Sequence, residues 1–241
     1  MKRRVGATVL ALMAASVLAG PVGAAAAVDV PEDCAVPPEI DLTQFNVVIG
    51  SERSEVLHGT AGPDFICGLL GDDVVFAGAG DDLVLGDTST FFGDVGAAGG
   101  RDTVFAGAGS DTVLPGPGDD TVFGQAGDDF LALAVGNDVG HGGPGADGIN
   151  GGFGRDVVAG DAGNDELVGG SDDDVVDGGA GDDVLLGELP PGSQPPRDVP
   201  VPAPATRDVC LGGPGTDAAL DCDTEVGVEG EFVPPPPEDE G

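Results

Sequence analysis

The sequence predicts an all-β repeat protein, and three observations support that prediction. Between residues 59 and 186 most of the chain divides into nine-residue units, and position six is Asp in every one. Positions one, two and four are mostly glycine, which allows the tight or left-handed backbone that a sharp turn requires. Positions seven to nine are mostly apolar and fit one short strand with alternating side chains. Each unit is therefore expected to form one turn and one strand.

The units fall into two blocks. Three units cover 59–85, the interruption GDTSTFFGDVG covers 86–96, and ten consecutive units cover 97–186. The interruption could be a bulged coil that keeps the stack, or a loop that divides it. Position eight of each strand is expected to point inward. Gly140 breaks this series, whose other members are Ile66, Val75, Val84, Val104, Val113, Val122, Leu131, Ile149, Val158, Leu167, Val176 and Leu185.

The aspartates matter because such a narrow core buries too little apolar area to order the coils by itself. If two units make one coil, aspartates in alternate units stack about 4.8 Å apart. Full charges at that distance repel by about 1 kcal/mol in water and about 3 to 4 kcal/mol at an effective dielectric constant of about 20. We expect one edge to carry Asp64, Asp82, Asp102, Asp120, Asp138, Asp156 and Asp174, and the other Asp73, Asp111, Asp129, Asp147, Asp165 and Asp183.

The units resemble the RTX, or hemolysin-type, calcium-binding repeat, whose pattern is G-G-x-G-x-D-x-U-x with U a large apolar residue. The likeness covers 59–186. It implies a parallel β-roll with two nonapeptide repeats per coil and several Ca²⁺ ions in the turns. The implied calcium ligands are the position-six aspartates of both edges, and Asp217, from a later GGPGTD segment, is a further candidate.

The alternative interpretation of these aspartates is a solvated acidic face, but ordinary solvated faces are not periodic with glycine. Calcium accepts about six to eight carboxylate and carbonyl oxygens in flexible geometry, whereas magnesium demands a smaller octahedral site. The sequence therefore favours calcium. The acids at position five are expected to face solvent or to stabilise turns, and they are Asp72, Asp81, Asp119, Asp128, Asp173 and Asp182.

The composition agrees with cation binding. The chain has 44 acidic residues against eight basic ones, and it contains no Trp or Tyr. So negative a surface repels nucleic acid and anionic lipid, while closely spaced carboxylates attract cations. We expect calcium as a partner, no nucleic acid and no membrane insertion; a protein or cell-surface partner is not defined by the sequence.

The first 27 residues have the layout of a cleaved signal peptide. Lys2, Arg3 and Arg4 precede an apolar run, and an alanine-rich segment follows it. A membrane-spanning anchor would need a longer uninterrupted apolar stretch. The protein is therefore expected to be secreted and extracellular, with retention at the cell surface left open.

Four cysteines in an exported chain favour two disulfides over a metal site, since no CxxC motif is present. Of the three possible connectivities, proximity favours Cys34 with Cys67 and Cys210 with Cys222. These pairs would staple the two ends of the roll.

The remaining segments divide by composition. Residues 28–58 are expected to form an N-terminal cap that contains a degenerate unit, with Glu55 in place of Asp. The range 187–205 is a proline-rich excursion. A C-terminal cap with a degenerate repeat is expected over 206–232, with Asp208 as a weaker ligand candidate, and a disordered tail over 233–241.

The leading functional hypothesis is a secreted calcium-binding module with a structural or interaction role that folds on binding calcium. An adhesin or ice-binding roll would need a regular outward array, and only Thr103 and Thr121 are expected to align. A polysaccharide-modifying parallel β-helix would need longer coils and aromatic sugar platforms. His58 and His141, at position nine, are expected to be exposed repeat residues, so no enzyme activity is predicted.

Overall fold

The computed structural model describes residues 30–31, 34, 36–37, 40–87, 99–188, 209–220, 222, 224–226 and 230–231. The expected signal peptide, nearly all of the proline-rich excursion, Asp208 and the C-terminal tail lie outside these ranges. Strands form almost all of the regular structure here, with a short 3-10 helix, η2 (Leu42–Gln44). No helix of the described ranges is both long and apolar enough to cross a membrane.

The strands form two parallel sheets, and consecutive strands alternate between them. Sheet A contains β1 (Asn46–Ile49), β3 (Asp64–Cys67), β5 (Leu83–Leu85), β7 (Thr112–Leu114), β9 (Phe130–Ala132), β11 (Gly148–Phe153), β13 (Glu166–Ser171), β15 (Val184–Glu188), β17 (Ala218–Leu220) and β19 (Gly230–Glu231). Sheet B contains β2 (Val56–His58), β4 (Val74–Ala79), β6 (Thr103–Ala108), β8 (Thr121–Ala126), β10 (Val139–Pro144), β12 (Val157–Ala162), β14 (Val175–Asp177), β16 (Val209–Leu211) and β18 (Thr224–Val226).

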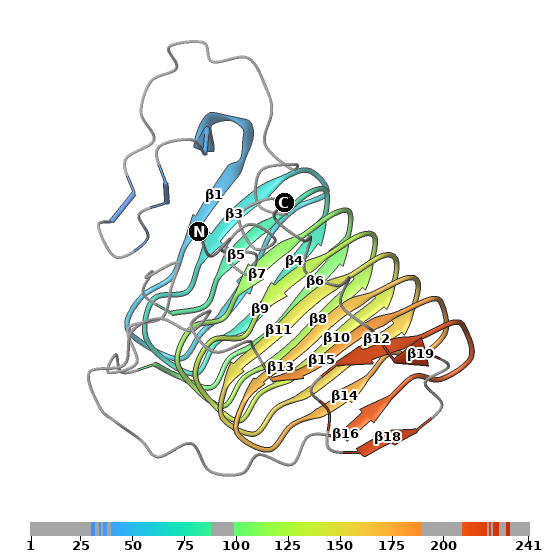
Figure 1. Ribbon diagram of the computed structural model, residues 1–241. Coiled ribbons are helices and arrows are strands. Elements are labelled where there is room, and N and C mark those ends of the chain that lie inside the picture. Colours follow the sequence, from blue (N-terminus) through green and yellow to red (C-terminus); the bar gives the residue numbers. More distant parts are fainter. Residues whose placement is uncertain are drawn as a thin grey trace, which may run out of the picture.

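Two nonapeptide units make one coil. Val139 pairs with Val157 in sheet B, and Ile149 pairs with Leu167 in sheet A. Each partner is two units further along the chain, so each coil contributes one strand to each sheet. Figure 1 shows the coils stacked in chain order, with β1 near one end and β16 and β18 near the other. The predicted parallel β-roll is confirmed.

Position-eight side chains fill the space between the sheets. All twelve predicted inward residues are at most 2% exposed. Gly140 leaves a gap in this core, and Leu133 occupies it: a Cβ built on Gly140 would lie 3.0 Å from Leu133 Cδ1. Leu133 stands at position one of the same unit, where most units have a small residue, so one unusual residue compensates for the other.

The interruption does not break the roll. Strand β4 pairs with β6, and β5 pairs with β7, across the inserted residues. The Gly86 amide donates to the Leu114 carbonyl at 2.9 Å, and the Asp87 amide donates to the Pro115 carbonyl at 2.7 Å. Gly86 and Asp87 are therefore positions one and two of the unit that ends at Phe105. The additional residues, 88–98, enter that unit between positions two and three.

The outer face of sheet B carries a column of stacked rings. His58, Phe76, Phe105, Phe123 and His141 follow one another at position nine, with ring centroids 5.0 to 5.4 Å apart. This distance is close to the spacing of parallel strands, so the register stacks the rings directly. The two histidines thus lie on the outer surface as the ends of an aromatic column.

The two predicted disulfides are present. Cys34 bonds to Cys67 in β3, and Cys210 in β16 bonds to Cys222. The first joins the N-terminal segment to an early coil, and the second joins late coils. Both lie near the ends of the roll, as the sequence predicted.

Candidate metal centre

The position-six aspartates form two continuous rows, each at the turn that enters one sheet. In both rows the backbone amide of each aspartate donates to Oδ1 of the aspartate in the next coil, at 2.8 to 3.1 Å. Row A precedes the strands of sheet A and contains Asp64, Asp82, Asp111, Asp129, Asp147, Asp165, Asp183 and Asp217. Row B precedes those of sheet B and contains Asp73, Asp102, Asp120, Asp138, Asp156 and Asp174.

The expected grouping of the edges was wrong at the interruption. Asp64 and Asp82 stack with Asp111, and Asp73 stacks with Asp102. The prediction gave the interruption a place of its own in the alternation of units. Because residues 88–98 are inserted inside one unit, the alternation continues unchanged, and the first three aspartates exchange rows.

These carboxylates are buried, and in most of them the second oxygen has no hydrogen-bond donor. Every position-six aspartate of the two rows is at most 3% exposed. Oδ1 accepts the amide described above. Within the described ranges, Oδ2 is buried without a hydrogen-bond partner in Asp73, Asp82, Asp102, Asp111, Asp120, Asp129, Asp138, Asp147, Asp156, Asp165, Asp183 and Asp217. A buried carboxylate oxygen with no donor is costly unless a cation faces it.

Asp64, the first aspartate of row A, differs from the others. Its Oδ2 accepts from the Thr60 amide at 2.6 Å and from the Thr60 hydroxyl at 3.0 Å. The first turn of the row therefore satisfies its carboxylate with protein donors. This sets Asp64 apart from the aspartates that follow it in row A.

Burial raises the pKa of most of the row carboxyls, and neighbouring carboxylates raise it further. The hydrogen bond from the aspartate amide of the preceding coil opposes this rise in pKa. Burial brings the pKa of Asp120 to about 7, that of Asp102 to about 8 and that of Asp138 to about 9. In row A, burial raises the pKa of Asp129 and Asp147 to about 7. Without a cation, a large share of these groups is therefore neutral near pH 7.

Glycine at position one brings backbone carbonyls close to these carboxylates. A Cβ built on Gly151 would lie 2.6 Å from Asp156 Oδ2 and 2.4 Å from the Gly169 carbonyl oxygen of the next coil. On Gly160 it would lie 2.2 Å from Asp165 Oδ2 and 2.6 Å from the next carbonyl oxygen. A side chain added at Gly151 or Gly160 would therefore meet a carboxylate and a carbonyl oxygen.

Positions two and four supply the turn itself. Gly107 and Gly109, which hold these positions in one unit, have φ values of 122° and 142°. Non-glycine residues at position two adopt positive φ as well, for example Asp161 at 70°. The predicted left-handed backbone is thus found at position two of most units and at position four of several, whereas the position-one glycines avoid close contacts with oxygens.

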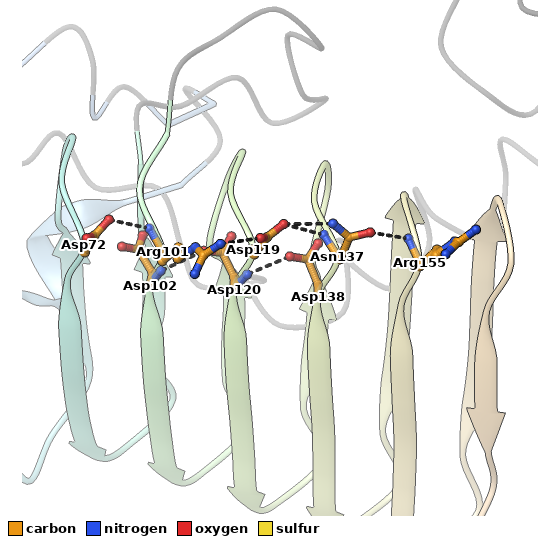
Figure 2. A network of polar contacts seen from close by, with 8 residues as sticks. All are labelled: Asp72, Arg101, Asp102, Asp119, Asp120, Asn137, Asp138 and Arg155. Atoms are coloured by element: carbon orange, nitrogen blue, oxygen red, sulfur yellow. Dashed lines mark hydrogen bonds and ion pairs between the residues drawn. The ribbon is translucent and has the colours of Figure 1, made fainter.

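Position five forms a separate, exposed row. Asp119 Oδ1 accepts from the amide and the side chain of Asn137 in the next coil, both at 3.0 Å. Its Oδ2 accepts from Arg101 in the preceding coil at 2.8 Å. Figure 2 shows this row passing from Asp72 to Arg155 beside Asp102, Asp120 and Asp138. The expected turn-stabilising role is confirmed for Asp72, Asp81, Asp119, Asp128 and Asp182, which all accept from the next coil.

The structure places three further residues at the edges: Glu55, which the sequence indicated as a degenerate member, and Asn46 and Asp87, which the repeat pattern missed. The Glu55 amide donates to Asp73 Oδ1 at 2.9 Å, so Glu55 begins row B as a degenerate member. Asn46 pairs with Asp64 and holds the corresponding place in row A. Asp87, at position two, is only 2% exposed. A burial pattern, rather than a sequence repeat, was needed to find Asp87.

A cation in these turns would need both side chains and backbone. Within the described part of the chain, no three Asp, Glu, His or Cys side chains form a metal-binding group by themselves. Calcium accepts backbone carbonyls together with carboxylates, and its geometry is flexible. The buried Oδ2 atoms and the carbonyls beside the position-one glycines are oxygen donors of that kind, so the residues present fit calcium.

Comparison with protein families gives the same result. The model of the RTX calcium-binding nonapeptide repeat (4 copies) matches residues 49–84, 97–131, 116–140, 134–167 and 159–189. These matches cover more than half of the chain, and the protein belongs to this family of calcium-binding repeat proteins. A search of curated proteins found no match.

Proposed function

We propose that the protein is a secreted calcium-binding module whose β-roll folds when calcium binds in its turns, and that it has a structural or interaction role without catalysis. The proposed ligands are the position-six aspartates of rows A and B. The observation that carries the proposal is the series of buried Oδ2 atoms without donors. Of these aspartates, Asp64 is the weakest candidate because Thr60 already satisfies its Oδ2.

The proposed mechanism follows from charge and burial. In the ion-free roll each row holds carboxyls that are either neutral, against their ordinary pKa, or charged and mutually repelling. Bound calcium supplies the positive charge that allows these carboxylates to ionise together. Because calcium binds the folded turns and not the open chain, each occupied site stabilises the roll.

Several features support an extracellular setting. Both cysteine pairs are oxidised, which is typical of exported proteins. The N-terminal segment has the composition of a signal peptide. Extracellular calcium modules bind with dissociation constants of about 10⁻⁴ to 10⁻³ M, so the same chain would stay open in a cytosol poor in calcium and fold after export.

The experiment is a calcium titration of the chain without residues 1–27, followed by far-ultraviolet circular dichroism, with magnesium as the control. The proposal predicts a largely disordered spectrum in chelator and a steep rise in β signal with calcium but not with equimolar magnesium. A β-rich spectrum in excess chelator, with a melting temperature that calcium does not change, would overturn it.

A further inference from the structure

The most unusual buried acid of the roll is Asp87, which does not belong to the repeat pattern. It holds position two of the interrupted unit, where the uninterrupted units on either side have Gly78 and Gly107 with positive φ. Asp87 is 2% exposed, as deeply buried as the row aspartates. A buried acid at position two needs a structural reason.

One oxygen of Asp87 joins the two ends of the insertion. Asp87 Oδ2 accepts from the Gly100 amide at 2.9 Å. Asp87 is the last residue of the unit before the inserted segment, and Gly99 and Gly100 are the first after it. This hydrogen bond explains Oδ2 but leaves Oδ1, which is buried and has no hydrogen-bond partner among the described residues.

Other oxygens lie around the same turn. A Cβ on Gly86 would lie 2.3 Å from both Asp102 Oδ2 and the Pro115 carbonyl oxygen. A Cβ on Gly99 would lie 2.2 Å from Asp87 Oδ2 and 1.6 Å from the Pro117 carbonyl oxygen. The two prolines have no N–H to donate, so they contribute only acceptors here.

The charges around Asp87 are negative as well. Besides burial, Asp120, Asp73 and Asp72 raise its pKa, and Asp87 in turn raises the pKa of Asp102. The nearby guanidinium of Arg101 pairs instead with Asp119 at the surface. Two buried carboxylates and two carbonyls thus share one turn without a positive group, which is an environment that a hard divalent cation stabilises.

We propose that Asp87 and Asp102 together bind a calcium ion at the base of the insertion, with the Pro115 carbonyl as a neighbouring donor. Asp102 and the Pro115 carbonyl occupy the places that the repeat pattern gives them, and Asp87 is a further ligand from position two, which the repeat pattern does not include. The inference rests on the proposed function, since Asp102 belongs to row B. The bound ion fixes the point at which the chain leaves the roll and returns to it.

The test compares Asp87→Asn with Asp161→Asn in the full chain without residues 1–27. The amide side chain in Asp87→Asn keeps an oxygen for the Gly100 amide but loses the charge. Asp161 also stands at position two, but it is exposed and pairs with His141 at 3.2 Å. Equilibrium dialysis with calcium is expected to show one bound ion fewer per chain in Asp87→Asn, and no change in Asp161→Asn.

A second measurement separates a ligand from a merely structural residue. The slope of folding free energy against the logarithm of calcium concentration counts the ions bound on folding. Asp87→Asn is expected to lower this slope by about one ion, whereas a structural residue would shift the curve at unchanged slope. An unchanged ion count or slope in Asp87→Asn overturns the inference. If the unsubstituted chain binds no calcium, the proposed function fails instead.

Discussion

Asp119 and Asp120 are neighbours in the chain and have opposite environments. Asp120 lies in row B and is 1% exposed, whereas the side chain of Asp119 is 39% exposed. Burial raises the pKa of Asp120 to about 7. Hydrogen bonds from Asn137, and then the charge of Arg101, lower the pKa of Asp119. The place of an acid within the turn, rather than its charge, therefore decides what it can bind.

The position-six and position-five side chains also connect the coils in opposite directions. A position-six side chain accepts from the amide of the preceding coil, as Asp120 does from Asp102. A position-five side chain accepts from the amide of the following coil, as Asp119 does from Asn137. Position five finds protein donors for its oxygens, while position six leaves an oxygen without one. Only the position-six arrangement therefore leaves an oxygen available to a cation.

The largest expected effect is that of pH, because it acts on many of the row carboxyls at once. Their folded pKa values, about 7 for Asp120 and about 9 for Asp138, lie above the ordinary value of 3.8. Between these limits the folded ion-free chain keeps protons that the unfolded chain has lost, so its stability falls as pH rises. In chelator we expect more β structure at pH 5 than at pH 8, measured by circular dichroism.

With calcium present, we expect more β structure at pH 8 than at pH 5, since protons compete with calcium for the same oxygens.

Asp119 does not contribute to this pH dependence. Its pKa is lowered, so its contribution to folding stability is present above about pH 4 and is lost only below that. It therefore does not act between pH 5 and 8. Ion-free β content that rises with pH over this range would contradict the assignment of the buried row.

The next largest effect is expected from Asp120→Asn, compared with Asp119→Asn. Loss of a direct ligand should weaken calcium binding at that turn by at least the roughly ten- to hundredfold, or about 1.4 to 2.7 kcal/mol, that is typical for loss of an outer-shell partner. Loss of the exposed acid should change the affinity by less than about twofold. Calorimetric titration of both variants measures the difference, and the same pair at Asp147 and Asp128 repeats it for row A. Equal losses at positions five and six would contradict the account.

A smaller effect is expected from adding a side chain at a position-one glycine that lies close to a row carboxylate. A Cβ on Gly142 would lie 2.3 Å from Asp147 Oδ2, so Gly142→Ala should destabilise the calcium-loaded roll by about 1 kcal/mol or more. Gly62→Ala is the control, because an added Cβ there meets nothing within 4 Å. Thermal unfolding in excess calcium compares them. A similar melting temperature for both variants would show that the turn at Gly142 tolerates a side chain.

The smallest effect is expected from Arg101→Ala, which removes the ion pair with Asp119 at the exposed row. An exposed pair of this kind contributes little to stability, and less at high salt. Thermal unfolding at low and high salt measures this contribution. A loss of several kcal/mol would mean that the exposed row, and not the buried one, holds the coils together.

The sequence predicted most of the periodic part of this structure. Twelve inward residues, both disulfides and the stacking of alternate units could be predicted because each follows from a repeat of fixed length or from simple proximity. Burial of the position-six row follows from the same repeat. Features that follow the nine-residue repeat can therefore be predicted from the sequence alone.

The features that break the period could not be predicted. Gly86 and Asp87 belong to a unit whose other residues follow eleven positions later, and only the hydrogen bonds to Leu114 and Pro115 show this. Counting units along the chain therefore placed Asp82 in the wrong row. Leu133, which fills the space at Gly140, likewise makes a contact between two residues that both depart from the repeat pattern. Such pairings are decided by packing in space.

The most direct test of the central claim is a crystal structure of the protein grown in calcium, with an anomalous difference map at a wavelength where calcium scatters anomalously. The account predicts two lines of calcium peaks inside the turns, each beside the Oδ2 atoms of row A or row B, and none along position five. Calcium peaks confined to the exposed row of Asp119 and its equivalents, or buried Oδ2 atoms without any peak beside them, would contradict it.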